Sequence, residues 1–151
     1  TFCRDKDGVL ASLLAAEAAL IAKLQGKTLL DILKEIHFRW GESNEEIASV
    51  HFPESKEGRK EMRLAMDDLR AYPPSHLEGI EVLTCYDYSL RSEEKESSLP
   101  LSDTLLFRLA DGSKIVVRPS GTEPKIKIYG ETTGVPAKCQ NLLQAMVKRL
   151  S

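Results

Sequence analysis

The sequence has few cysteines, histidines and aromatic residues, and it carries almost no net charge. Its 151 residues include three cysteines and three histidines, scattered without a CxxC pair or a zinc-ligand spacing. We therefore expect no zinc site and no disulfide framework, with thiols kept reduced in the cytoplasm. The formal net charge of -2 lacks the basic excess typical of nucleic-acid-binding domains. No apolar run approaches the roughly 20 residues of a membrane span, and no signal peptide is visible, so neither nucleic acid nor a membrane is an expected partner.

The remaining composition is that of a folded chain. A hydrophobic content of 42% is enough for a core. The length suits one domain, or one domain plus a piece of another. The chain begins at Thr1 without a methionine, so we expect it to be part of a longer protein. Arg59, Lys60 and Arg63 alternate with glutamates, and we interpret them as a solvated helix face.

Residues 1–42 are expected to be helical. Asp7 is a candidate N-cap for a helix to about Leu24, and Thr28 for a second helix to about Trp40, each followed by a glycine. The polar stretch 43–46 is the predicted boundary with a second domain over residues 43–151. This helical pair is expected to be a fragment of a preceding domain; the alternative is a partner-binding helix pair.

The second part alternates strands and helices. The pattern predicts a strand over 47–52, a helix over 55–72, strands over 80–88, 104–109, 114–117 and 125–129, and a helix from about Pro136 to Leu150. This order predicts an α+β fold, with an antiparallel sheet of four to five strands and two helices on one face. In the strand 80–88, Ile80, Val82 and Tyr86 are expected on one face, with Leu83 and Cys85 on the other.

The segment 118–125, Arg-Pro-Ser-Gly-Thr-Glu-Pro-Lys, lies between two of these strands. An arginine fork, two hydroxyls, a glycine and a nearby ammonium group are suited to binding a phosphate. Gly121 lets backbone N–H groups approach a ligand and tolerates unusual dihedral angles. The alternative is an ordinary hairpin turn, in which Ser, Gly and Thr are common. The segment nevertheless has no Asn-Gly or Asp-Gly hairpin signal, and two prolines bracket it.

This segment resembles the C-terminal phosphate-binding loop of the alpha-D-phosphohexomutases, the phosphoglucomutase/phosphomannomutase family. Weaker similarities precede it in the family's order and cover nearly the whole chain, at 4–11, 26–29, 69–74, 99–103 and 111–113. The resemblance implies that residues 1–42 are the helical tail of the third domain. It implies that residues 43–151 are the C-terminal domain, with a TATA-box-binding-protein-like fold.

The family transfers a phosphoryl group between positions 1 and 6 of a hexose through an enzyme phosphoserine. The resemblance therefore implies a hexose phosphate substrate, Mg²⁺, a sugar bisphosphate activator and the remaining domains of the same chain as partners. The family's serine, magnesium and sugar-specificity loops would all precede Thr1, so this chain alone is expected to be inactive. A stand-alone phospho-ligand-binding module without catalysis is the alternative.

The candidate phosphate-binding residues are Arg118, Ser120, Gly121, Thr122, Lys125 and Lys127. Ser120 has no histidine beside it in sequence, so we interpret it as a phosphate ligand and not a nucleophile. Strand alternation puts Lys125 and Lys127 on one face, and the resemblance favours Lys127 as the phosphate contact. Glu123 would repel a dianion and is expected to point away and pair with a lysine or a backbone N–H.

Lys6 is the one candidate catalytic residue. The resemblance implies that its segment reaches the catalytic phosphoserine, where a lysine serves acid–base or charge-stabilising work. Asp5 and Asp7 flank it and favour its charged form, which points to charge stabilisation. The alternative is a surface lysine in a loop that leads into a helix.

Overall fold

The structure is a computed structural model that describes residues 7–90 and 100–151. The candidate residue Lys6 lies outside the described residues, as does the charged and serine-rich stretch 91–98, for which the sequence predicts a surface loop. The chain separates into two compact units, Thr1–Glu42 and Ser43–Ser151, and each is described by itself.

The first unit consists of the two predicted helices, α1 (Gly8–Leu24) and α2 (Leu29–Trp40). Asp7 caps α1 by accepting a hydrogen bond from the Leu10 N–H at 2.9 Å, and Thr28 and Asp31 form a capping box on α2. Of the described residues of this unit, only Ala22 is buried. No single helix in the described part of the chain is long and apolar enough to cross a membrane. The bent pair of α1 and α2, at 88°, passes that test of length and composition.

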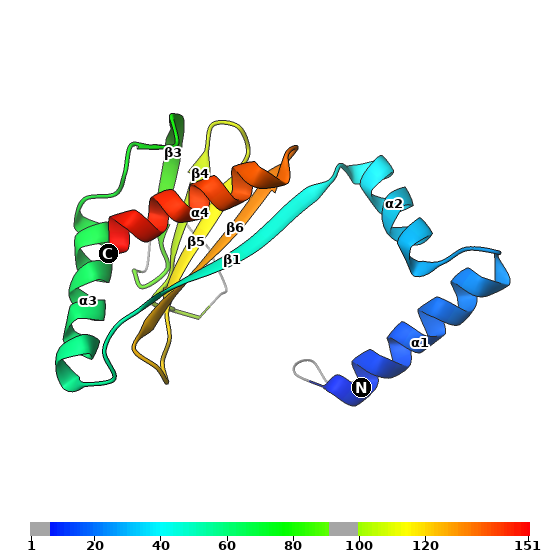
Figure 1. Cartoon of the computed structure of the whole chain (residues 1–151), viewed down its shortest axis with the longest axis horizontal. Helices are drawn as coiled ribbons and strands as arrows, with labels where there is room; N and C mark the ends of the chain where they lie inside the picture. Colours follow the sequence, from blue (N-terminus) through cyan, green and yellow to red (C-terminus); the bar gives the residue numbers. More distant parts are fainter. Residues whose placement is uncertain (1–6, 91–99) are drawn as a thin grey trace. The chain divides into compact units, whose positions relative to one another are not determined.

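The second unit is an antiparallel six-stranded sheet with two helices (Figure 1). This confirms the predicted α+β class. The elements are β1 (Ser43–His51), α3 (Lys56–Ala71), β2 (His76–Leu77), β3 (Ile80–Asp87), β4 (Leu105–Leu109), β5 (Lys114–Pro119), β6 (Lys125–Thr133) and α4 (Pro136–Leu150). The strand order is β1-β6-β5-β4-β3-β2.

Strand β1 starts four residues earlier than the sequence predicted. The polar stretch 43–46, expected to be a break, pairs with the end of β6 from Ser43 opposite Thr133 to Glu46 opposite Gly130. Pairing with a distant strand outweighs local polarity here, as is common for β-structure. The same pairing brings the end of β1, at His51, opposite Lys125 and therefore beside the 118–125 segment.

Both helices pack on one face of the sheet, and α4 crosses in front of the strands in Figure 1. The core lies between them and includes Met66 and Leu69 of α3, Phe107 of β4 and Met146 of α4. At Gly130 of β6 a side chain would meet the Cys139 sulfur at 2.8 Å, so glycine lets α4 approach the sheet closely. We call the opposite face, which neither helix covers, the open face.

One predicted face assignment in β3 is wrong. Val82 lies opposite the core residue Leu109, whereas Tyr86 lies opposite Leu106 on the other face of the sheet. A register irregularity between Val82 and Thr84 adds a residue to β3 and reverses the alternation beyond it. A single-residue shift of this kind moves every later side chain to the other face.

Candidate functional site

The segment 118–125 closes the hairpin between β5 and β6. The Ser120 N–H donates to the Lys125 carbonyl at 2.8 Å, and the Glu123 N–H donates to Ser120 Oγ at 3.3 Å. Ser120 Oγ lies 3.4 Å from Thr122 Oγ1, so the two hydroxyls are adjacent. The N–H groups of Gly121 and Thr122 donate no hydrogen bond to any residue within 7–90 and 100–151. Two hydroxyls and two unpaired amides therefore gather at the tip of one loop.

Arg118 and Lys127 form a cross-strand pair at the base of this loop. They are direct partners in the β5–β6 ladder, and Lys127 also lies opposite Ser49 of β1. All three side chains belong to the open face, because their neighbours Val117, Ile126 and Ile128 are buried against the helices. Neither cation has an ion-pair partner among the described residues. Like charges directly opposite each other destabilise a sheet, and a bound anion would relieve this repulsion.

Lys125 is engaged differently from Lys127. Its Nζ pairs with Glu123 Oε2 at 2.5 Å, as expected for this glutamate. The hydrogen bond and charge of Lys125 lower the pKa of Glu123. Of the two candidate lysines, Lys127 is therefore the one left available to a ligand.

Gly121 leaves open space beside the loop, and its backbone conformation is an ordinary one. Its φ lies outside the left-handed region, and an added Cβ would meet nothing within 4 Å. The loop therefore does not use the left-handed backbone that glycine tolerates. The open space beside Gly121 is what a ligand approaching the backbone amides requires.

A pocket of about 400 Å³ lies beside the loop. It is lined by residues of the loop, of α3 and of the segment before β4: Arg59, Met62, Arg63, Met66, Ser102, Asp103, Arg118, Pro119, Ser120 and Gly121. Arg59 also donates from Nη2 to the Thr122 carbonyl at 3.1 Å. Arg59, Lys60 and Arg63 are all exposed, as expected for a solvated helix face, but Arg59 also contacts the loop, which the sequence did not predict. No local signal marks this residue, because its contact depends on β1 pairing with β6.

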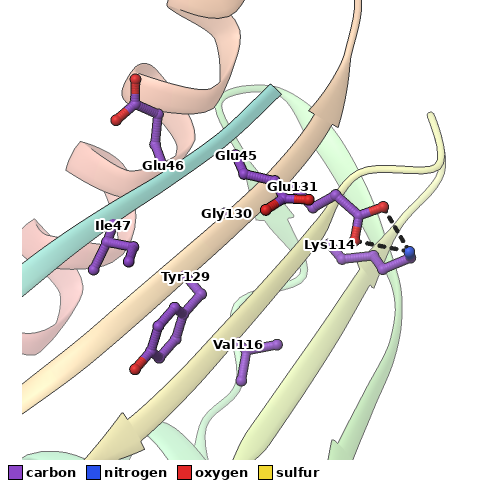
Figure 2. Close-up of a pocket in the computed structure, with 8 residues that line it drawn as sticks. All are labelled: Glu45, Glu46, Ile47, Lys114, Val116, Tyr129, Gly130 and Glu131. Atoms are coloured by element: carbon purple, nitrogen blue, oxygen red, sulfur yellow. Dashed lines mark hydrogen bonds and ion pairs between the residues drawn. The ribbon is translucent and has the colours of Figure 1, made fainter. Parts of the chain in front are cut away.

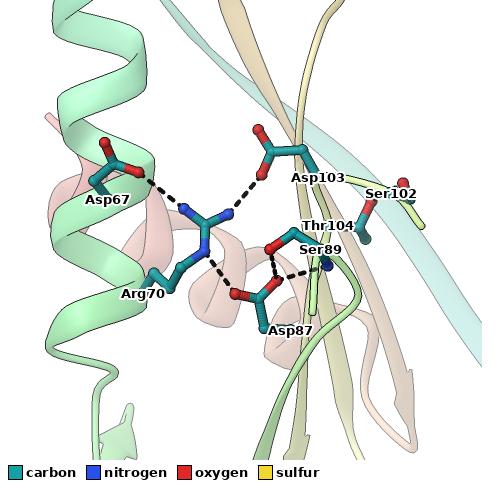
Figure 3. Close-up of polar contacts among 7 residues, drawn as sticks. All are labelled: Asp67, Arg70, Asp87, Ser89, Ser102, Asp103 and Thr104. Carbon is teal, nitrogen blue, oxygen red and sulfur yellow. Dashed lines mark hydrogen bonds and ion pairs between the residues drawn. The ribbon is translucent and has the colours of Figure 1, made fainter. Parts of the chain in front are cut away.

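The wall of this pocket at Asp103 is held by Arg70 of α3 (Figure 3). Arg70 donates to Asp103 Oδ1 and to Asp87 Oδ2, each at 2.6 Å, and to Asp67 Oδ1 at 3.0 Å. Burial raises the pKa of Asp87, but hydrogen bonds from Ser89 and Arg70 outweigh it and the net shift is downward. One guanidinium thus ties α3 to the end of β3 and to the start of β4.

A larger pocket, of about 640 Å³, lies at the other end of the open face (Figure 2). Ile47, Val116 and Tyr129 line its apolar part, and Lys114 is paired with Glu131 at 2.8 Å. Glu45 and Glu46 also border it. These carboxylates would repel a phosphate, so the larger pocket is a poorer anion site than the loop.

The described residues do not form a metal centre. Within residues 7–90 and 100–151, no three His, Cys, Asp or Glu side chains come together as ligands. Burial raises the pKa of the Cys85 and Cys139 thiols, which disfavours the thiolate form that binds metals. Mg²⁺ prefers oxygen ligands, and the described residues provide no group of three ligating side chains for it.

Comparison with known proteins gives a consistent result. Residues 61–149 match the model of the family described as "Phosphoglucomutase/phosphomannomutase, C-terminal domain". A phosphoglucomutase of Staphylococcus haemolyticus is 38% identical over an alignment of 135 residues that covers 85% of this chain and 24% of the relative. One of Staphylococcus aureus is 37% identical over an alignment of 147 residues that covers 93% of this chain and 25% of the relative. The chain thus spans about a quarter of the length of these relatives.

A solved structure shares the fold. The open form of the exocytosis-sensitive phosphoprotein pp63/parafusin, a phosphoglucomutase from Paramecium, superposes with a TM-score of 0.61 at 21% identity. The match covers 97% of this chain and 27% of that one.

Proposed function

The chain belongs to the phosphoglucomutase/phosphomannomutase family, and from this premise we propose that it is the C-terminal part of a phosphohexomutase. In this proposal residues 1–42 are the helical tail of a third domain, and residues 43–151 are the phosphate-binding domain. The whole protein would interconvert hexose 1-phosphate and hexose 6-phosphate through an enzyme phosphoserine. The chain alone would be inactive.

The pairing of Arg118 with Lys127 beside a donor-rich loop is the observation that carries this proposal. A sugar phosphate dianion would neutralise both cations, which face each other without a counter-ion among the described residues. The hydroxyls of Ser120 and Thr122 and the amides of Gly121 and Thr122 would donate to its oxygens. This is a grip on the distal phosphate: it holds the sugar while the other phosphate reacts, and the loop contains no nucleophile–base pair.

The remaining chemistry would involve Lys6 and other parts of the longer protein. Lys6, outside the described residues, is proposed to stabilise charge at the reacting phosphate. If Lys6→Ala leaves the kcat of the longer protein unchanged, Lys6 is a surface lysine without a catalytic role. Mg²⁺ would supply charge neutralisation at that phosphate, held by ligands outside this chain. A sugar bisphosphate activator and a cytoplasmic location complete the proposal.

The decisive test is an assay of the longer protein that contains this chain against hexose 1-phosphates. Interconversion with the 6-phosphate, with a phosphoserine detected by mass spectrometry, is expected. Inorganic phosphate titrated into the 151-residue chain should bind at roughly millimolar concentration, with the largest amide shifts at Ser120, Gly121 and Thr122. Binding at the loop without turnover by the longer protein would favour the stand-alone module, and shifts elsewhere would overturn the loop assignment.

A further inference from the structure

Helix α3 and the segment that leads into it are attached to the loop at two points. The Phe52 N–H donates to the Pro124 carbonyl at 2.9 Å, and Arg59 Nη2 donates to the Thr122 carbonyl at 3.1 Å. Both acceptors are backbone carbonyls on the loop's return towards β6. The loop is therefore held from outside as well as by its own hydrogen bonds.

The first turn of α3 is itself fixed in place. The Ser55 side chain caps the helix by accepting from the Gly58 N–H at 3.0 Å. A Cβ at Gly58 would lie 2.1 Å from the Pro53 carbonyl oxygen, so the incoming chain passes directly against this turn. Arg59 follows Gly58, so its backbone belongs to this fixed turn, and its side chain reaches the loop from there.

From these contacts we infer that Arg59 is a positioning residue for the phosphate-binding loop. It acts through the Thr122 carbonyl: by holding that peptide group, it orders the neighbouring amides and hydroxyls towards one anion before the anion arrives. Its side chain also borders the pocket that contains Arg118, Ser120 and Gly121. The inference rests on the proposed function of the loop, and it adds a residue from outside the motif.

Lys60 provides a matched control for charge. It is the next residue of α3, it is exposed, and it has no hydrogen bond or ion pair within the described residues. Lys60→Ala removes the same formal charge from the same helix turn without touching the loop. Any difference between Arg59→Ala and Lys60→Ala therefore reports the hydrogen bond to Thr122 and not the net charge.

The experiment uses the 151-residue chain and inorganic phosphate. Backbone order parameters at Gly121, Thr122 and Glu123 are measured without phosphate, and the dissociation constant for phosphate is measured by amide shifts. Arg59→Ala should lower the order parameters and weaken phosphate binding by about 3- to 10-fold, the factor that one net hydrogen bond supplies. Lys60→Ala should change neither, with both thermal midpoints close to that of the wild type. Arg59→Lys should restore part of the affinity, because a point donor reaches the carbonyl with poorer geometry.

The outcomes separate this inference from the proposed function. If the wild type binds phosphate and Arg59→Ala leaves loop order and affinity unchanged, the positioning role is wrong. The role is also wrong if Arg59→Lys restores the full phosphate affinity while its loop order parameters stay as low as those of Arg59→Ala. Charge alone would then explain the effect on binding. If the wild type does not bind phosphate at the loop, the proposed function fails, and the order parameters still decide whether Arg59 holds the loop.

Discussion

Arg118 lies directly opposite Lys127 in the β5–β6 ladder, on the sheet face that neither α3 nor α4 covers. Neither side chain has an ion-pair partner among the described residues. Such a pair costs folding free energy in the absence of a ligand and stabilises the complex once an anion binds. The arrangement is therefore typical of a binding site rather than of a structural strand.

Arg118→Ala should weaken phosphate binding more than any other single change in the loop. Loss of a charge-assisted hydrogen bond predicts a decrease of about 10- to 100-fold in phosphate affinity, and of the same order in kcat/KM of the longer protein. Arg118→Lys should rescue only partly, since a point charge cannot reproduce the guanidinium fork. Titration of the chain and steady-state kinetics of the longer protein provide the two measurements.

Arg108→Ala is the control for Arg118→Ala, because Arg108 is an exposed arginine of the neighbouring strand β4. It should leave affinity and kcat/KM nearly unchanged. Equal losses for the two variants would show that only the general positive field of the face matters, and would contradict the specific assignment.

Lys127→Ala should have opposite effects on stability and on binding. Without phosphate, removing one of two facing cations should stabilise the fold by roughly 0.2–1 kcal/mol. With phosphate, the same variant should bind more weakly than the wild type. Urea denaturation with and without phosphate measures both effects. Lys125→Ala is the comparison, and it should show no gain because Lys125 is paired with Glu123.

Gly58→Ala should destabilise the second unit. The added Cβ would lie 2.1 Å from the Pro53 carbonyl oxygen, so α3 or the preceding segment must shift. Overpacking of this kind costs about 1–3 kcal/mol. Gly121→Ala is the matched control, because its Cβ would meet nothing within 4 Å. Thermal unfolding of both variants is the measurement. Equal unfolding midpoints for Gly58→Ala and Gly121→Ala would contradict the prediction.

Asp87→Asn should lower the free energy of unfolding at neutral pH, and the loss should be smaller in acid. Burial opposes ionisation of Asp87, but hydrogen bonds from Ser89 and Arg70 lower its pKa below the ordinary value. Its stabilisation is therefore complete above the unfolded-state pKa of about 3.9 and is lost as the pH falls through the lower folded-state value. We expect a loss of about 1–3 kcal/mol at pH 7.

The Asp87 prediction is measured by urea denaturation at pH 7 and at pH 3. The difference between wild type and variant should shrink at the lower pH. Asp67→Asn is the control, because Asp67 makes a more exposed pair with the same arginine, and such pairs contribute little. A difference that stays constant between the two pH values would contradict the role of Asp87.

The helical unit should drive self-association of the isolated chain. Its apolar side chains Leu13, Leu24, Phe38 and Trp40 are all exposed, and large exposed apolar patches are rarely left open. Sedimentation velocity should show oligomers for the chain and a monomer after deletion of residues 1–41. A monomeric full chain, with solubility and stability unchanged by the deletion, would refute this expectation.

Local sequence signals were sufficient for most elements of this chain. The caps at Asp7 and Thr28 and the stop signals after each helix give α1 and α2 nearly their observed bounds. Caps and periodicity act within a few residues, so they can be recognised without a fold. The loop could also be found from sequence, since its arginine, hydroxyls and glycine all lie within the segment 118–122. The bulge in β3 could not, because its extra residue is defined only against its partner β4.

The amino-acid sequence by itself determined the α+β class, the helices, the hairpin and the donor set of the loop. The tertiary structure decided which lysine has no ion pair among the described residues, which residue faces Arg118 and which residues outside the loop hold it. Lys125 and Lys127 share a strand face, and only their neighbours distinguish them: Glu123 pairs with the first, and Arg118 faces the second. Arg59 lies 63 positions from Thr122, and pairing between distant strands is what brings them together. Local propensities cannot encode such contacts, because their free energy exists only once the sheet has formed.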